Sequence, residues 1–133
     1  MGWQEQLRRL GETKAQRDRK EEENKRRLEE SKKEVISCAG PIIKRIAKLT
    51  ECPLSQFHDD YWHMFIRSYD SGPVIDIEFH YDGVALTLYG YHCGSYQGGD
   101  LQDYEFVPIS GTSAPFEERL ASVFERFVRR YIT

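Results

Sequence analysis

The stretch Val74–Gly94, "VIDIEFHYDGVALTLYGYHCG", decides the fold of this chain. Apolar and polar residues alternate on both sides of Asp82-Gly83, and this dipeptide is a strong signal for a two-residue hairpin loop. The pattern predicts two antiparallel strands, Val74–Tyr81 and Val84–His92. The loop also sets their register, because side chains alternate between the two faces of a sheet. The pairs that we expect are Tyr81 with Val84, Phe79 with Leu86, and Ile77 with Leu88.

Two more strands are predicted on either side of this hairpin, Tyr61–Tyr69 and Leu101–Ile109. If "DSGP" (70–73) is a four-residue loop, Ile66 and Met64 face Ile77 and Phe79 on the buried side. On the outer side, Arg67 then falls opposite Asp76, and His63 opposite His80. The facing of the last strand is left open, because either Tyr104 and Phe106 or Glu105, Val107 and Ile109 can point toward the core.

Helices are predicted before and after the strands. Apolar residues between Val35 and Leu49 recur at helical spacing, and Gly40-Pro41 is expected to kink or restart that helix. The segment 114–132, "APFEERLASVFERFVRRYI", is amphipathic, with acids in its first turn and arginines in its last. The sequence therefore predicts an α+β fold, a four-stranded antiparallel meander with both helices packed on one face.

Residues 1–34 differ in kind from the rest of the chain. They are almost wholly polar, and several Glu residues stand four positions before Lys or Arg, which stabilises a helix. A heptad register started at Leu7 and Leu10 has no apolar residue in its middle two heptads, too few for a self-sufficient coiled coil. We expect a charged helical arm at 1–34 and a single α+β domain at 35–133, with Trp3, Leu7 and Leu10 as an apolar group at the arm's far end.

Charge is distributed unevenly along the chain. Between Glu51 and Ser113 there are ten acidic residues and one basic residue, Arg67, although the whole chain carries a net charge of only −3. The sheet should therefore project a negative field. This field disfavours nucleic acid and favours a basic protein partner, although an acidic surface also serves solubility alone.

These patterns favour a non-enzymatic protein–protein interaction module. It would bind its partner through acids and tyrosines of the outer sheet face and the loops around it, namely Asp76, Glu78, Tyr89, Tyr91, Asp100 and Asp103. In size and charge alone the chain resembles small acidic inhibitors and immunity-type proteins that block nucleases. That resemblance implies an inhibitor of a basic protein.

The arm offers a different function. Through Trp3, Leu7 and Leu10 it would join a partner helix or a second copy, making the protein an adaptor or a homodimer. The layout is similar to that of helix–sheet–helix nucleoid-binding proteins, an analogy of architecture alone. Its basic runs would reach phosphates, but residues 1–34 hold eleven bases and nine acids, which largely cancel.

A metal-dependent enzyme is the third hypothesis. His63, His80 and Glu78 would form a ligand set if the predicted register is correct, although alternating polar residues are also typical of the wet face of a one-sided sheet. No nucleophile–base pair or phosphate-binding glycine motif is present, so we expect no enzymatic activity and no cofactor.

The cysteines and the hydropathy indicate where the protein resides. Cys38, Cys52 and Cys93 are an odd set with long spacings, unlike a disulfide framework, and Cys38 is expected to be a buried thiol. No apolar run is long enough to span a bilayer, and the N-terminus has no signal-peptide core. We expect a soluble, cytoplasmic protein.

Overall fold

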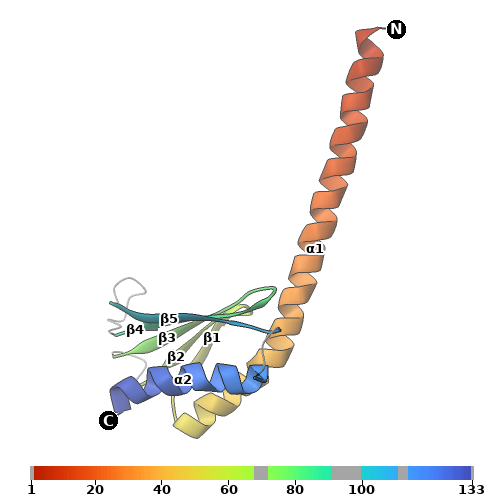
Figure 1. Cartoon of the computed structure of the whole chain (residues 1–133). Coiled ribbons are helices and arrows are strands. Elements are labelled where there is room, and N and C mark those ends of the chain that lie inside the picture. The colour runs from red at the N-terminus through yellow and green to blue at the C-terminus, as the bar shows by residue number, and fades with distance from the viewer. Residues whose placement is uncertain (1, 68–71, 91–99, 111–113, 133) are drawn as a thin grey trace.

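The computed structural model describes residues 2–67, 72–90, 100–110 and 114–132. The elements are α1 (Trp3–Thr50), β1 (Leu54–His58), β2 (Tyr61–Phe65), β3 (Val74–Phe79), β4 (Gly83–Tyr89), β5 (Leu101–Pro108) and α2 (Phe116–Ile132). The strands form one antiparallel sheet in the order β1-β2-β3-β4-β5 (Figure 1). The predicted α+β class, antiparallel meander and helical arm are confirmed, but the sheet has five strands and not four.

The missed strand is β1, an edge strand of five residues. It lies between Pro53 and a two-residue turn at Asp59-Asp60, and its pairing with β2 is irregular between Ser55 and His58. Such an irregularity breaks the alternation of apolar and polar residues by which a strand is recognised. Burial along β1 accordingly shows no period of two.

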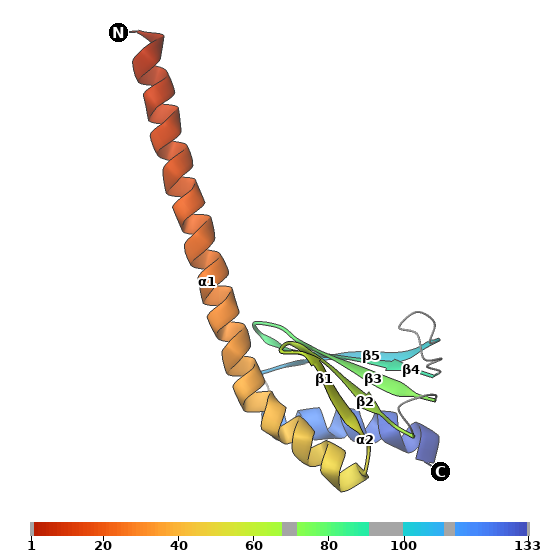
Figure 2. The ribbon, with the colours of Figure 1, turned by 180° about the vertical axis from the view of Figure 1, so that it is seen from behind.

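Helix α1 is one continuous helix of 48 residues. It ends at Thr50, and the left-handed backbone of the next residue, Glu51 (φ 58°), turns the chain so that the Cys52 N–H bonds the carbonyl of Ala47 at 3.0 Å. Pro41 lies inside the helix, so the predicted restart is wrong. The axis does change direction in this region: the last turns of α1, yellow in Figures 1 and 2, run obliquely beneath the sheet, away from the line of the arm. A proline causes such a bend because it has no N–H for the carbonyl four residues earlier.

The two predicted registers are both shifted. In the β3–β4 hairpin, Phe79 faces Val84 and Ile77 faces Leu86. The N–H of His80 bonds the carbonyl of Gly83 at 2.9 Å, so the loop is Tyr81-Asp82 and Gly83 begins β4. This position in β4 requires glycine, because a Cβ at residue 83 would lie 2.4 Å from the Val107 carbonyl oxygen. A shift of two residues keeps every side chain on its predicted face.

The β2–β3 register is off by four residues, which again preserves the faces. Met64 faces Ile75, not Phe79, and His63 faces Asp76, not His80. Strand β2 stops at Phe65, and the N–H of Ile66 bonds the carbonyl of Pro73 at 3.0 Å. The connection is therefore longer than the "DSGP" loop that the sequence suggested, and Arg67 lies beyond β2 rather than opposite Asp76.

The hydrophobic core lies between the sheet and both helices, which cover the same face (Figure 2). From α1 it takes a stripe that begins at Val35 and continues with Ala39, Ile43 and Ala47. From α2 it takes Leu120, Val123, Phe124 and Phe127. These side chains pack on inward residues of the central strands, among them Met64, Ile75, Ile77, Leu86 and Leu88. Among the described residues, no helix is long and apolar enough to cross a membrane.

Candidate functional site

The face of the sheet that the helices leave uncovered is here called the open face. The alternation of side chains along the paired strands assigns its members. They are Tyr61, His63, Phe65, Val74, Asp76, Glu78, Ala85, Thr87, Tyr89, Tyr104 and Phe106. The set includes two acids and five tyrosine or phenylalanine rings on neighbouring strands.

Asp76 is the most highly connected acid of the open face. The Tyr61 hydroxyl donates a hydrogen bond of 2.6 Å to its Oδ2, and His63 Nε2 lies 3.4 Å from Oδ1. The Asp76 side chain is only 17% exposed, and His63 is buried, with the Phe57 ring stacked 6.0 Å from its imidazole. Asp76 is thus held in place by its neighbours.

Glu78 lies two residues further along β3 and is more accessible. Its side chain is 51% exposed, and His80 Nε2 lies 3.5 Å from Glu78 Oε2. Asp76 and Glu78 point to the same side because they are two residues apart on a strand. They form an acidic pair, one carboxylate anchored and one exposed.

The field of this pair is evident at the adjacent tyrosines. Burial raises the pKa of Tyr89, and the charges of Asp76 and Glu78 raise it further. The pKa of Tyr61 is raised even more, first by burial and then by its hydrogen bond to Asp76. Negative charge opposes formation of a phenolate, so the two carboxylates add to the effect of burial on the pKa of both tyrosines.

The metal hypothesis depended on His63 and His80 facing one another, and the observed register separates them. His63 pairs with Asp76 and His80 with Glu78, so the candidates His63, His80 and Glu78 do not meet at one point. Within the described ranges, no group of three or more His, Cys, Asp or Glu side chains is placed to hold a metal ion.

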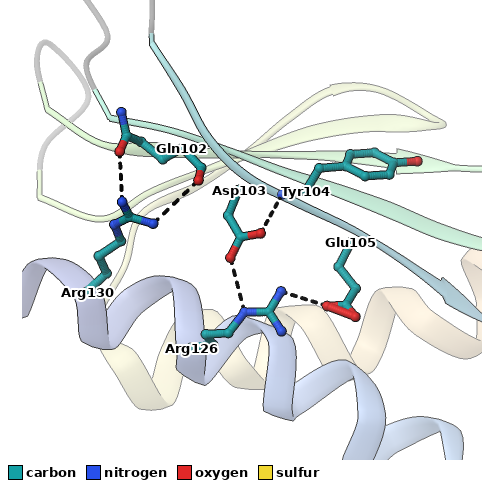
Figure 3. Close-up of polar contacts among 6 residues, drawn as sticks. All are labelled: Gln102, Asp103, Tyr104, Glu105, Arg126 and Arg130. Carbon is teal, nitrogen blue, oxygen red and sulfur yellow. Dashed lines mark hydrogen bonds and ion pairs between the residues drawn. The ribbon is translucent and has the colours of Figure 1, made fainter.

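Asp103 belongs to the opposite face. Arg126 of α2 lies between two acids of β5, with Nε 3.1 Å from Asp103 Oδ2 and an Nη 2.6 Å from Glu105 Oε2 (Figure 3). Next to it, Arg130 donates to the Gln102 side chain at 3.0 Å. The open question of β5 is thereby answered: Glu105 and Val107 face the helices, whereas Tyr104 and Phe106 lie on the open face.

The other predicted binding residues lie at three places. Asp100 is exposed just before β5, and Tyr91 lies outside the described residues. Trp3, Leu7 and Leu10 are 68%, 57% and 65% exposed at the far end of α1, away from the sheet (Figure 1).

The predicted burial of Cys38 is wrong: Cys38 is exposed on α1, whereas Cys52 is the buried thiol. Cys93 lies outside the described residues.

Sequence reasoning missed the exposed ring of Phe57 and left the facing of the exposed Tyr104 open. Phe57 is 49% exposed on β1, the strand that was not predicted, and Tyr104 is 56% exposed on β5, whose facing was left open. The facing of β5 could have been found from its alternation. Asp103 and Glu105 both pair with Arg126 of α2, so Tyr104 and Phe106, which alternate with them, lie on the other face.

No family model matches this chain, and searches of curated proteins and of solved structures find no match either.

Proposed function

We propose that this protein is a non-enzymatic protein–protein interaction module that binds a basic protein partner through the open face. One observation carries the proposal. Among the described residues, no Lys or Arg forms an ion pair with Asp76 or Glu78, whereas the acids on the helix-covered face share Arg126. Uncompensated acids side by side on a sheet face present a negative patch that a basic surface complements.

Aromatic rings around the acidic pair add area that can be buried. Tyr89 is half-buried next to Asp76, and Tyr104 and Phe57 are about half exposed. Tyrosine and phenylalanine are enriched at interfaces because they bury large area with few rotatable bonds. Binding would begin with electrostatic steering by the acids and end with burial of these rings, so association should slow as salt increases.

An acidic inhibitor is the specific form of this function that we favour. A protein site that binds phosphates with Lys and Arg also accepts carboxylates. A small domain that presents Asp76 and Glu78 on a rigid sheet would occupy such a site and block it. Asp76 is pre-positioned by Tyr61, which lowers the conformational cost of binding.

The test uses the full chain, immobilised and exposed to lysate of its source organism at low and at moderate ionic strength. Glu78→Lys reverses the accessible charge of the open face. The matched control is Glu51→Lys, an identical change at an exposed position after α1, where a basic residue also suits the helix dipole.

A basic protein retained by the wild type and by Glu51→Lys, and released by Glu78→Lys or by salt, is the expected result. Equal retention of that protein by Glu78→Lys would show that the open face is not the binding surface. Capture of no basic protein at low salt would also contradict the proposal.

The arm is a second candidate, favoured by the exposure of Trp3, Leu7 and Leu10 at its end. An adaptor or a homodimer would cover these side chains with another helix. A nucleic-acid role for its basic runs predicts a gel shift at low salt that weakens steeply as salt rises, and no shift at low salt would eliminate this role.

A further inference from the structure

The arm, residues 3–34 of α1, extends from the body of the protein as a single helix (Figures 1 and 2). Every residue from Gly2 to Glu30 is exposed except Glu5 and Ala15, which are partly buried. The first ion pair between the arm and the sheet is that of Lys32 with Asp60, at the base. A long helix without tertiary contacts gains little stability from packing, and pairing with another helix would provide the missing contact.

One stripe of α1 remains accessible from end to end. At the far end it carries Trp3, Leu7 and Leu10, and at the base it carries Cys38, Pro41 and Arg45, all of them exposed although the core begins at Val35. Steps of three or four residues connect the two ends through Lys14, Arg17, Glu21, Asn24, Arg27, Ser31 and Glu34, all of them exposed except the half-buried Ser31. Residues at this spacing lie on one side of a helix.

We propose that two copies of the protein pair through this stripe as antiparallel helices, with the two-fold axis at Asn24. In this register Glu21 lies opposite Arg27 of the second copy, and Lys14 lies opposite Glu34 of the second copy. The symmetry repeats each contact, since a two-fold interface places the same residues on both sides. The charges on the stripe are therefore complementary along the middle of the arm.

The same register accounts for the apolar residues at the two ends. Leu10 lies opposite Cys38 of the second copy, and Leu7 opposite Pro41 of the second copy. The exposed far end of each arm thus covers the exposed stripe at the base of the other. Within one chain these segments cannot meet, because 28 residues of continuous helix separate Leu10 from Cys38 by about 42 Å.

Other alignments bring like charges together. A parallel pair in register places Glu21 against Glu21 and Lys14 against Lys14. Sliding the antiparallel pair by one heptad places Glu21 against Glu34 in one direction and Lys14 against Arg27 in the other. Polar residues at such positions select one register at the expense of stability, so we expect a weak, register-specific dimer.

The first test is a charge swap, read by sedimentation equilibrium over a wide range of loading concentrations. The wild type should dimerise reversibly. Glu21→Arg places arginines opposite one another and should raise the dimer dissociation constant about tenfold or more. The double variant Glu21→Arg with Arg27→Glu restores opposite charges between copies and should restore the dimer.

Glu22→Arg is the matched control, because Glu22 is turned about 160° from Asn24 on the helix. Glu21 and Glu22 each have a basic residue four positions later, Lys25 and Arg26, so both variants lose a similar contact within the helix. Circular dichroism confirms that helicity is retained. A dimer weakened equally by Glu22→Arg, or not restored by the double variant, would overturn the proposed register, and a monomeric wild type would overturn the dimer.

The second test locates the ends by cross-linking. In a Cys93→Ser background, Leu10→Cys is oxidised and its disulfides are mapped by mass spectrometry. The proposal predicts links between residue 10 and Cys38, which can form only between copies. Links of residue 10 to itself and of Cys38 to itself would indicate a parallel pair and overturn the antiparallel arrangement. Both tests are independent of any ligand of the open face.

Discussion

Tyr61 and Asp76 are joined across the open face by a hydrogen bond of 2.6 Å, although they are not opposed in the sheet. Tyr61 pairs with Glu78, and Asp76 pairs with His63. The bond is therefore diagonal, within the reach of a long aromatic side chain across neighbouring strands. It links Asp76 on β3, an acid of the proposed binding surface, to the neighbouring strand β2.

Tyr61→Phe removes this hydrogen bond and leaves the ring in place. We expect a loss of about 1 kcal/mol in the free energy of unfolding at neutral pH, because a part-buried carboxylate loses a donor. Urea denaturation monitored by circular dichroism measures the loss. Tyr81→Phe, at an exposed position in the β3–β4 turn, is the control and should leave stability unchanged.

The alkaline limit of stability should also depend on Tyr61. Its folded-state pKa lies above the ordinary value of 10.0, so the folded protein keeps a proton that the unfolded chain releases. Stability is fully present below that ordinary value and is lost as pH rises above it. Denaturation midpoints from pH 9 upward should fall less steeply in Tyr61→Phe than in the wild type, and identical slopes would contradict this linkage.

Close packing against the Trp62 ring favours glycine at position 40. A Cβ at Gly40 would lie 3.1 Å from the Trp62 ring, whereas a Cβ at Gly11 would meet nothing within 4 Å. Gly40→Leu should therefore lower the free energy of unfolding by about 1–3 kcal/mol through overpacking. Gly11→Leu, the same change in the same helix, should leave it unchanged and raise helicity at 222 nm, because leucine is the better helix former.

Arg126→Met should separate charge from packing at the α2–β5 contact. It leaves Asp103 and Glu105 as neighbouring like charges and retains the aliphatic part of the side chain. Because Arg126 is half exposed, we expect a loss of about 0.5–1 kcal/mol that diminishes in high salt. Arg129→Met, which loses only a pair with Glu125 within α2, should cost less, and a loss independent of salt would exclude the electrostatic explanation.

Lys32→Met should change how the free energy of unfolding depends on pH in the acidic range. The hydrogen bond from Lys32 holds the pKa of Asp60 below its ordinary value of 3.8. This ion pair contributes stability above that value, and the contribution is lost as pH falls through the folded-state pKa. In Lys32→Met, a carbon-13 titration should show the Asp60 carboxyl at a higher pKa. No change would mean that Lys32 does not stabilise the carboxylate.

Several features of the fold could be predicted from local pattern. Apolar residues at period two in Val74–Phe79 and Gly83–Tyr89 specify which side chains enter the core, and an error of two or four residues in register does not alter this assignment. The amphipathic pattern of Phe116–Ile132 and the polar, helix-favouring composition of the arm are equally local. The open face with Asp76, Glu78 and Tyr89 followed from these periods alone.

Tertiary structure decided what depends on close approach between segments. Gly83 begins β4 at a place where Val107 of β5 leaves no space for a side chain, and a hairpin rule based on Asp82-Gly83 contains no information on this contact. Asp103 does not belong to the acidic open face, because it pairs with Arg126 of α2, 23 residues later in the sequence. The sequence by itself determined the faces, since side-chain direction repeats along each element. The partners across those faces were decided only by packing, since register depends on connection lengths and long-range contacts.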